Sequence, residues 1–289
     1  MAGIESEKVV ALDKRTASTR SRRSGRFTAS GVLLQLGVIA SVLIAWQLLV
    51  VGLDVASYIV PRPLQVLYAL WNGLAVNPLS PQSYYYHAYF TLLSTLGGFV
   101  LGSIAGVVLG ILVAESPFLE RHLYPYVVVI RSIPKLALAP LFIVWFGFGL
   151  APKVATVTLM TFFPVAVNAI EGFRAIEPER IQLMRSLSAT RRQIFLMVKF
   201  PSALPFIFAG LNIGLQLAVT AAIVAEFVGA QQGLGILLLN MNQLMDVAGS
   251  FSIVVILALI GIGLNTVTRR IQKKIVFWAP DVADGNETL

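Results

Sequence analysis

Long apolar stretches alternate with polar segments along this chain. The six apolar stretches cover approximately residues 31–53, 88–114, 124–148, 152–170, 203–228 and 250–267. A helix of ~20 apolar residues, rising about 1.5 Å per residue, crosses the ~30 Å hydrocarbon core of a bilayer. The pattern therefore predicts an all-α, polytopic membrane protein with about six transmembrane helices.

Polar segments flank and interrupt the predicted membrane domain, which covers residues 31–272. Residues 1–30 form a basic tail rich in Ser and Thr, which we expect to be disordered in the cytosol. Residues 171–200 are the one long charged stretch between spans, and residues 273–289 form a second polar tail. The apolar run that begins near residue 31 is longer than the core of a signal peptide.

The basic residues predict the orientation of the spans. With both termini in the cytosol, 18 of the 22 Lys and Arg residues lie on the cytosolic side. Only Arg62 and Lys153 fall outside, and Arg131 and Lys135 lie within the third span. Because cytoplasmic segments carry an excess of Lys and Arg, this split predicts cytoplasmic termini and a cytosolic 171–200 segment.

The composition supports a lipid environment and excludes several other functions. The chain is 57% hydrophobic and 12% charged, with a mean hydropathy of +0.80. It has no cysteine, and its two histidines, His87 and His122, are far apart, so no metal site is expected. The net charge of +8 gathers at helix ends, where membrane topology explains it without nucleic acid. No GxxxxGK[ST] phosphate loop occurs, so any ATP must be bound by another chain.

The second span carries a stripe of glycines, at Gly98, Gly102, Gly106 and Gly110. Residues four apart share a helix face, and glycines on it allow another backbone to approach closely. The stripe predicts helix packing.

The third span contains two cations, Arg131 and Lys135, together with Pro134 and Pro140. Residues four apart share one helix face, and a charge at membrane depth usually faces protein or water. Two interpretations stay open. The cations line a path for a polar or anionic solute, or they satisfy carbonyls freed by the prolines and extend toward the interface.

The fifth span carries a polar stripe of Asn212, Gln216 and Thr220, followed by Glu226 near its outer end. Hydrogen bonds between helices and a solute path both explain the stripe. We interpret Glu226 as a buried gate or structural residue rather than a general acid, since no partner for acid–base chemistry lies nearby in the sequence. No catalytic residues are expected.

The charged 171–200 segment predicts a docking element. Glu177-Pro178-Glu179 is a helix-start signal, with acidic residues near the positive end of the helix dipole. A short amphipathic helix then places Ile181, Met184 and Leu187 on one face, Ser188-Ala189-Thr190 interrupts it, and a second segment leads from Arg191 to Pro201. Exposed apolar residues between charges favour insertion into the groove of another protein.

These residues resemble a known family. The stretch from Gln182 to Pro205 resembles the EAA loop of ABC transporter permeases, and Arg131 to Pro140, Leu141 to Gly149 and Ala225 to Gly235 are similar to signatures of the nitrate/sulfonate/taurine-type importers. The resemblance covers roughly residues 85–275. Two positions depart from the pattern: Gln182-Leu183-Met184 stands for the EAA triplet, and Ser188 for the usual glycine, which must accept a left-handed cap or shift the turn.

The resemblance implies a permease subunit of a bacterial ABC importer in the inner membrane. It implies a cytosolic ATPase that binds ATP and Mg²⁺, an extracytoplasmic solute-binding protein and a second permease copy. In this family the loop inserts into a cleft of the ATPase and transmits its closure. The coupling residues are then Gln182, Leu183, Met184, Leu187, Ser188, Ala189, Arg191 and Pro201. The expected path or gate residues are Arg131, Pro134, Lys135, Asn212, Gln216 and Glu226.

Two other functions compete with this interpretation. An ion-coupled secondary transporter would show paired broken helices and carboxylates at the midplane, whereas only one span is clearly interrupted. A membrane scaffold would not need the paired cations or the polar stripe. The cations favour an anionic solute such as a sulfonate, nitrate or carboxylate, but the family also imports pyrimidine-type vitamin precursors.

Overall fold

The structure, a computed structural model, describes residues 29–131 and 133–278, and the chain divides into two units, Met1–Val55 and Ala56–Leu289. The described part of the first unit is essentially one helix, α2 (Ala29–Gly52). Its sequence is apolar all round, and large side chains such as Leu34 and Leu48 are exposed, as in a helix that faces lipid. Both expected tails lie outside the described residues, except for the end segments at residues 29–30 and 273–278.

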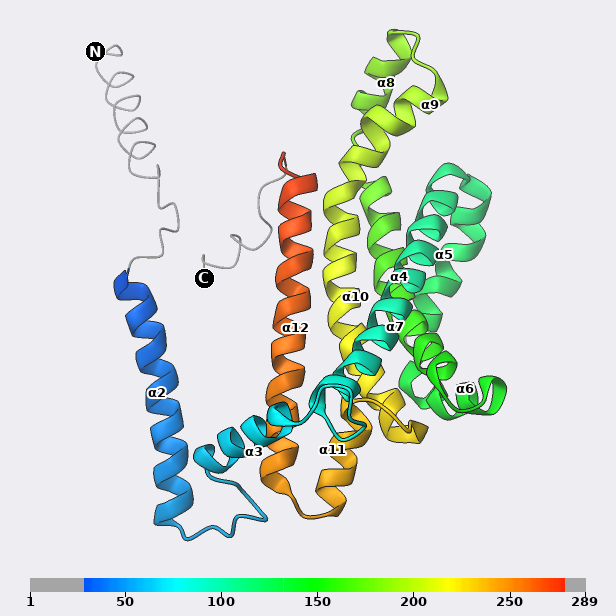
Figure 1. Ribbon diagram of the computed structural model, residues 1–289. Coiled ribbons are helices and arrows are strands. Elements are labelled where there is room, and N and C mark those ends of the chain that lie inside the picture. Colours follow the sequence, from blue (N-terminus) through cyan, green and yellow to red (C-terminus); the bar gives the residue numbers. More distant parts are fainter. Residues whose placement is uncertain (1–28, 132, 279–289) are drawn as a thin grey trace, which may run out of the picture. The chain divides into compact units, whose positions relative to one another are not determined.

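Four long helices form the second unit and run along one another (Figure 1). They are α4 (Tyr84–Glu115), α7 (Leu150–Arg174), α10 (Phe200–Gly229) and α12 (Val247–Ile275). Among the described residues, these four and α2 are the helices long and apolar enough to cross a membrane. The all-α membrane fold expected from the sequence is therefore confirmed, with five such helices.

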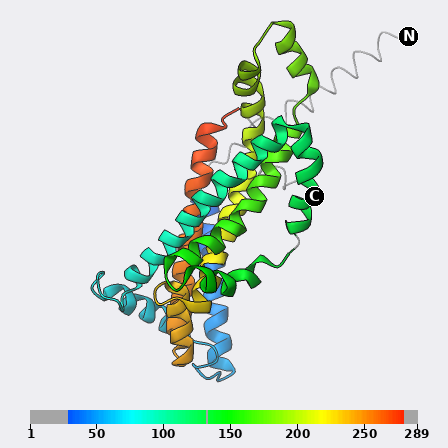
Figure 2. The same cartoon turned by 90° about the vertical axis from the view of Figure 1, so that its right-hand side faces the viewer.

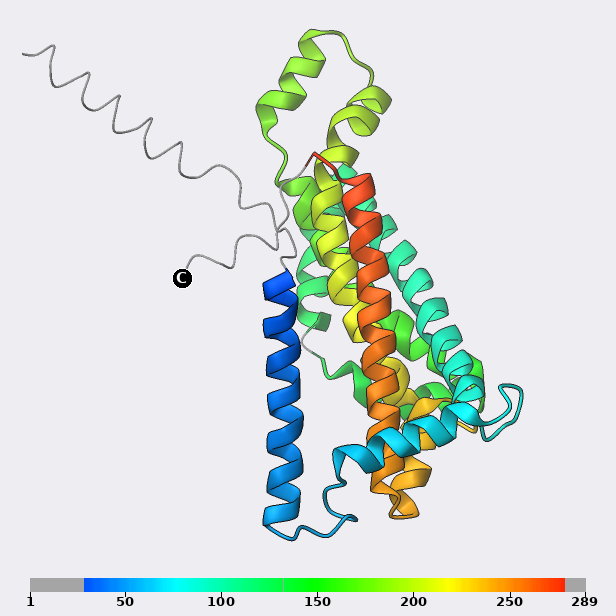
Figure 3. The same ribbon diagram turned by 60° about the vertical axis from the view of Figure 1, so that its left-hand side comes forward.

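Short helices gather at the two ends of this bundle (Figures 1 and 3). At one end α8 (Pro178–Ser186) and α9 (Arg191–Ile194) form a hairpin that projects beyond the long helices. A π-helical turn, Phe195–Lys199, joins the hairpin to α10. At the opposite end lie α3 (Pro63–Ala75) and α11 (Leu234–Gln243). The bundle thus has a hairpin end and an opposite end.

The third span, over residues 124–148, is interrupted as its prolines predict. The segment forms α5 (Pro117–Arg131), a 3₁₀ turn at Lys135–Leu138 and α6 (Ala139–Phe146). Pro134 and Pro140 lack the N–H that a continuous helix would need, and each instead stands at the start of a new helical piece. The pieces still lead from the hairpin end toward the opposite end (Figure 2). Successive crossings of the bundle by the chain therefore still alternate in direction.

The glycine stripe of α4 faces α7. A methyl group built on Gly102 would approach the Thr158 carbonyl oxygen to 2.6 Å, and one on Gly106 would approach the Phe162 carbonyl oxygen to 2.9 Å. Gly98 and Gly110 are buried against the same helix, beside Val157 and Ala169. The contacting atoms belong largely to backbone, which cannot rotate away.

Gly102→Ala is therefore expected to destabilise the bundle by ~1–3 kcal/mol, because the added carbon forces α4 and α7 apart. The matched control is Gly261→Ala on α12, where nothing lies within 4 Å of the added carbon. Thermal unfolding in mild detergent should show a lower midpoint for Gly102→Ala and no loss for Gly261→Ala. Equal midpoints in the two variants would contradict close α4–α7 packing.

Candidate functional site

Local capping signals build the α8–α9 hairpin. Pro178 occupies the first turn of α8, and Arg180 pairs with Glu177 at 2.8 Å. Thr190 caps α9 in a capping box, accepting a hydrogen bond from the Gln193 N–H while the Gln193 side chain accepts from the Thr190 N–H. The hairpin is thus held by contacts within its own sequence.

Ser188 adopts the left-handed conformation at the end of α8, with φ of +58°. Its N–H donates to the Arg185 carbonyl oxygen at 2.9 Å, and the Ala189 N–H donates to the Met184 carbonyl oxygen at 3.0 Å. This pair of bonds is the Schellman motif, which ordinarily has glycine at the position that Ser188 fills. The turn therefore keeps the conformation that glycine favours, and Ser188 accepts the steric cost.

Ser188→Gly is expected to stabilise the hairpin turn by ~1 kcal/mol, since glycine carries no Cβ penalty in the left-handed region. Amide hydrogen exchange at residues 188–189 should slow about fivefold, the factor that corresponds to this free energy. The control is Ala189→Gly, whose backbone has no positive φ and should not gain protection. Slower exchange in both variants would contradict this explanation, because the gain in protection would then not depend on the left-handed conformation of residue 188.

The outer face of the hairpin presents apolar residues among cations. The Leu183 and Leu187 side chains, four residues apart on α8, are 62% and 69% exposed. Gln182, Arg185 and Arg191 of the same hairpin are also exposed, and we call these five residues the coupling surface. Met184, Ala189 and Pro201 are only partly exposed, as is Ile181. Of the three residues expected to share an apolar face, Leu187 is exposed, whereas Ile181 and Met184 are half-buried.

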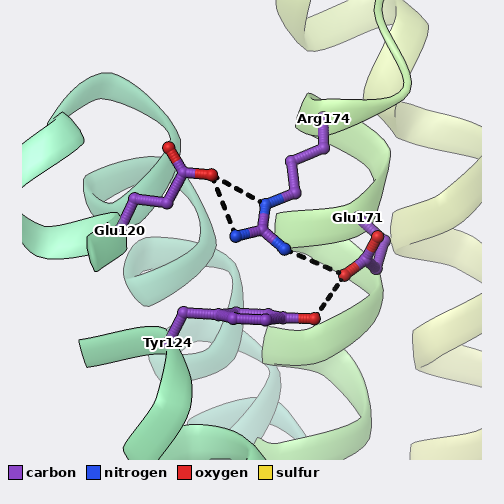
Figure 4. Close-up of polar contacts among 4 residues, drawn as sticks. All are labelled: Glu120, Tyr124, Glu171 and Arg174. Carbon is purple, nitrogen blue, oxygen red and sulfur yellow. Dashed lines mark hydrogen bonds and ion pairs between the residues drawn. The ribbon is translucent and has the colours of Figure 1, made fainter. Parts of the chain in front are cut away.

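An ion-pair cluster holds the stem that leads into the hairpin (Figure 4). Arg174, the last residue of α7, donates to Glu120 of α5 at 2.9 Å and lies 3.4 Å from Glu171. The Tyr124 hydroxyl donates to Glu171 at 2.6 Å, and the Arg174 guanidinium lies over the Tyr124 ring. The cluster ties α5 to the end of α7.

A second ion pair holds the stem that leaves the hairpin. Lys199, in the π-helical turn before α10, donates to Glu115 at the end of α4 at 2.6 Å. Glu115 and Glu120 flank the Ser116-Pro117 turn between α4 and α5. This α4–α5 turn therefore contacts both stems of the hairpin. Sequence reasoning missed these ties, although two acids around one turn face basic residues at each end of the charged stretch.

Glu226 lies at the opposite end of the bundle in a buried polar cluster. Its side chain is fully buried, and Thr91 Oγ1 of α4 donates to it at 2.9 Å. The Gly235 N–H donates to Glu226 at 2.7 Å, and the Leu234 N–H donates to Thr91 Oγ1 at 2.8 Å. Glu226 and Thr91 thus satisfy the first N–H groups of α11, which have no partner within the helix.

His87 and Lys153 fasten the loop that precedes α11. The Gly233 N–H donates to His87 Nδ1 at 3.1 Å, and His87 Nε2 lies 2.9 Å from the Pro81 carbonyl oxygen. Lys153 donates to the Gln232 carbonyl oxygen at 2.8 Å and is only 4% exposed. Lys153 was expected on the extracytoplasmic side, and at the end opposite the hairpin it is buried within the protein. Four polar side chains from α4, α7 and α10 therefore position α11.

The remaining path candidates do not converge. Lys135 lies over the Phe163 ring, 4.8 Å from its centroid, beside α7 and α10. Asn212 donates to Gln272 of α12 at 2.8 Å, and Gln216 lines a separate groove between α10 and α12. Pro134 immediately precedes the 3₁₀ turn that carries Lys135, and the side chain of Arg131 lies outside the described part of the structure.

Comparisons with known proteins agree with this arrangement. Residues 106–277 match the family described as "Binding-protein-dependent transport system inner membrane component". The chain is 34% identical to the formylaminopyrimidine transport permease protein ThiX of Halalkalibacterium halodurans, over 76% of this chain and 86% of that protein. It is 34% identical to the riboflavin transport system permease protein RibX of Chloroflexus aurantiacus, over 82% of this chain and 86% of that protein.

A third relative and a solved structure are also similar to this chain. The taurine transport system permease protein TauC of Escherichia coli is 28% identical over 87% of this chain and 91% of its own length. An inward-facing structure of the MetNI methionine ABC transporter shares the fold, with a TM-score of 0.53 and 22% identity over 75% of this chain and 98% of that one. This chain therefore belongs to the family of inner-membrane components of binding-protein-dependent transport systems.

Proposed function

We propose that this chain is the permease of an ABC importer whose ATP and Mg²⁺ are bound by a separate cytosolic ATPase. The observation that carries the proposal is the coupling surface, which exposes Leu183 and Leu187 on a hairpin that projects beyond the long helices. Exposed apolar residues in contiguous patches mark interaction sites. The exposed arginines of the hairpin favour a partner whose docking surface has an acidic or polar rim.

The hairpin end faces the cytosol in this proposal. Besides the hairpin's own cations, this end holds Arg121 of α5 and the four basic residues Arg269, Arg270, Lys273 and Lys274 near the end of α12. The opposite end holds Arg62 and the buried Lys153. Since cytoplasmic segments carry the excess of basic residues, the opposite end faces outward. There the solute-binding protein delivers cargo to a pair of permease copies.

Coupling follows from the ties between the hairpin and the rest of the bundle. Closure of the ATPase moves the coupling surface, and Arg174 and Lys199 pass that movement to the α4–α5 turn through Glu120 and Glu115. Because α5 is the first piece of the broken span and the 3₁₀ turn that begins at Lys135 is the next, the movement reaches Lys135. The inward-open and outward-open arrangements are then two states of one bundle, and the bound ATPase shifts their populations.

The relatives transport different solutes by name: formylaminopyrimidine, riboflavin and taurine. We therefore propose a small polar or anionic solute for this chain. Ion-coupled secondary transport is the alternative, and Glu226 is the carboxylate on which it would depend. Glu226 already accepts hydrogen bonds from Thr91 and the Gly235 N–H, which supports a structural role at α11.

Site-specific photo-crosslinking in native membranes tests the docking site. A benzophenone side chain placed at Leu187 should crosslink to a cytosolic ATPase subunit, identified by mass spectrometry. The matched control places the same group at Leu79, which is 87% exposed in the α3–α4 loop at the other end. Capture of the ATPase from Leu79, or of no ATPase from Leu187, would contradict the proposed docking.

A further inference from the structure

Helix α3 has two apolar faces that point in opposite directions. Val66 is buried on one face, and from the same face Leu70 and Leu74 pack against a core cluster that includes residues of α12. On the other face, four side chains recur at the i, i+3, i+4, i+7 spacing of one helix surface and are 61–71% exposed. We call this second face the α3 stripe: Leu64, Leu67, Tyr68 and Trp71. Packing of the bundle therefore accounts for only one of the two faces.

The depth of α3 in the membrane follows from its contact with α12. The core cluster beneath α3 contains Ile253 and Leu257 of α12, and α3 lies across that helix (Figure 3). The basic residues near the end of α12 begin at Arg269, which places one membrane boundary there. Ile253 and Leu257 lie about 24 and 18 Å from Arg269 along the helix axis. Since the hydrocarbon core is ~30 Å thick, α3 packs within the half that is farther from the hairpin.

The composition of α3 suits this depth. Pro63–Ala75 contains no charged residue, and the α3 stripe combines two leucines with a tyrosine and a tryptophan. Tyr and Trp concentrate where hydrocarbon meets the headgroups, because each has an apolar ring and a polar tip. Gln65 and Asn72 lie between the two apolar faces and line a cavity of about 1010 Å³, together with Asp246 at the start of α12. The helix thus has a polar flank toward the α11–α12 turn and an apolar stripe away from the bundle.

These observations favour lipid over protein as the occupant of the α3 stripe. A large exposed apolar patch marks a surface that binds either protein or membrane. A water-soluble solute-binding protein docks outside the hydrocarbon, whereas the stripe lies at the depth of acyl chains. Protein interfaces also surround their apolar centre with a polar rim, and α3 offers polar groups on one flank only. A helix with an apolar face, interfacial aromatic residues and a polar flank is the type that lies in the plane of a leaflet.

We propose that the α3 stripe is a lipid-binding surface and that α3 is an interfacial helix embedded in the outer leaflet. The stripe contacts acyl chains, while Gln65 and Asn72 face the headgroups and water. The core cluster beneath α3 also contains Leu234, the first residue of α11, so contact with lipid holds α11 at a fixed depth. The choice of leaflet rests on the orientation proposed above, whereas the contact with lipid does not.

Site-directed spin labelling tests this contact, and the absence of cysteine in the chain makes each label specific. A nitroxide is attached at Leu67→Cys in the full-length permease, with whatever ATPase accompanies it, in lipid nanodiscs. Its collision rates are measured with O₂, which dissolves in hydrocarbon, and with nickel(II) ethylenediaminediacetate, which stays in water. The matched control is Leu79→Cys, which replaces an 87% exposed leucine in the α3–α4 loop. Trp71→Cys repeats the measurement at a second position of the stripe.

We expect the ratio of O₂ to nickel collisions to be at least about tenfold higher at Leu67→Cys and Trp71→Cys than at Leu79→Cys, because hydrocarbon excludes the polar nickel complex. A high nickel collision rate at the two stripe positions would show that water covers them, and would overturn the proposal. Low collision rates with both reagents would show that protein covers them, such as a second permease copy, and would overturn it as well.

Two further readouts separate the choice of leaflet and the import function from the contact with lipid. An impermeant maleimide added to cells whose inner membrane is intact should label Leu79→Cys, and labelling only after that membrane is opened would overturn the assignment to the outer leaflet. Recovery of an ATPase with the purified chain reports on the import function alone. Lipid contact without an ATPase would support the α3 stripe and contradict the importer, and an ATPase without lipid contact would do the reverse.

Discussion

Leu183→Asp is expected to abolish ATP-driven transport while leaving the protein inserted in the membrane at normal levels. The Leu183 side chain is 62% exposed at the hairpin end, so the substitution removes little internal packing. In the complex, however, the new carboxylate is buried in an apolar contact, where an unpaired charge costs several kcal/mol. A loss of ~2 kcal/mol at the centre of an interface weakens docking about 30-fold.

The measurement is the amount of ATPase retained by tagged permease after purification, together with uptake into cells. Leu183→Met is the matched variant that keeps an apolar contact and should retain both. Leu79→Asp introduces the same charge on an exposed leucine at the opposite end and should retain the ATPase. Normal ATPase recovery and uptake in Leu183→Asp would contradict docking of the ATPase at the coupling surface.

Arg174→Gln is expected to separate ATP hydrolysis from transport. Arg174 does not belong to the coupling surface, so the ATPase should still bind and hydrolyse ATP. The substitution removes the ion pair to Glu120 and leaves α5 tied to α7 mainly through Tyr124 and Glu171. Movement of the hairpin then reaches the broken span less completely, and we expect uptake to fall at least about tenfold, which corresponds to a coupling free energy of ~1.4 kcal/mol.

Arg180→Gln is the matched control for this prediction. Arg180 also loses an ion pair, but its partner Glu177 lies three residues away in the same hairpin, so no tie between elements is broken. Both side chains of each pair are partly exposed, so each variant should change stability by no more than ~1 kcal/mol. Exchange of the charges, Arg174→Glu with Glu120→Arg, should restore part of the uptake. Equal uptake in Arg174→Gln and Arg180→Gln would contradict the transmission through α5.

The sequence predicted the long helices because lipid imposes a simple requirement on them. A span must be apolar over its length and must satisfy its own backbone hydrogen bonds, so α4, α7, α10 and α12 follow from hydropathy alone. The third span shows where this reasoning stops. Its hydropathy suits a crossing, but Pro134 and Pro140 divide it into separate pieces, and only the structure shows where each begins.

The hairpin could be predicted in part because its signals are local. Glu177-Pro178 and Ser188 act within a few residues of their own position, and both mark helix ends in the structure. Which apolar residues of the hairpin are exposed could not be predicted from such local signals. Ile181 and Met184 are half-buried while Leu183 and Leu187 are exposed, a difference that the spacing of apolar residues in α8 does not predict.

The buried polar contacts could not be predicted, because their partners are distant in the sequence. Thr91 and Glu226 are 135 residues apart, and His87 and Gly233 are 146 apart. Lys153 illustrates the consequence: counting charges assigns it to a side of the membrane, but its hydrogen bond to the loop before α11 and its burial appear only in the structure. The ties of Arg174 and Lys199 to the α4–α5 turn are of the same kind.

Purification of the tagged chain from its native membrane tests whether it is the permease of an ABC importer. We expect an ATPase subunit to be recovered in about equal amounts with the permease, and transport by the recovered complex to require ATP. Recovery of the chain without an ATPase, with uptake into vesicles powered by an ion gradient alone, would contradict the importer and favour secondary transport.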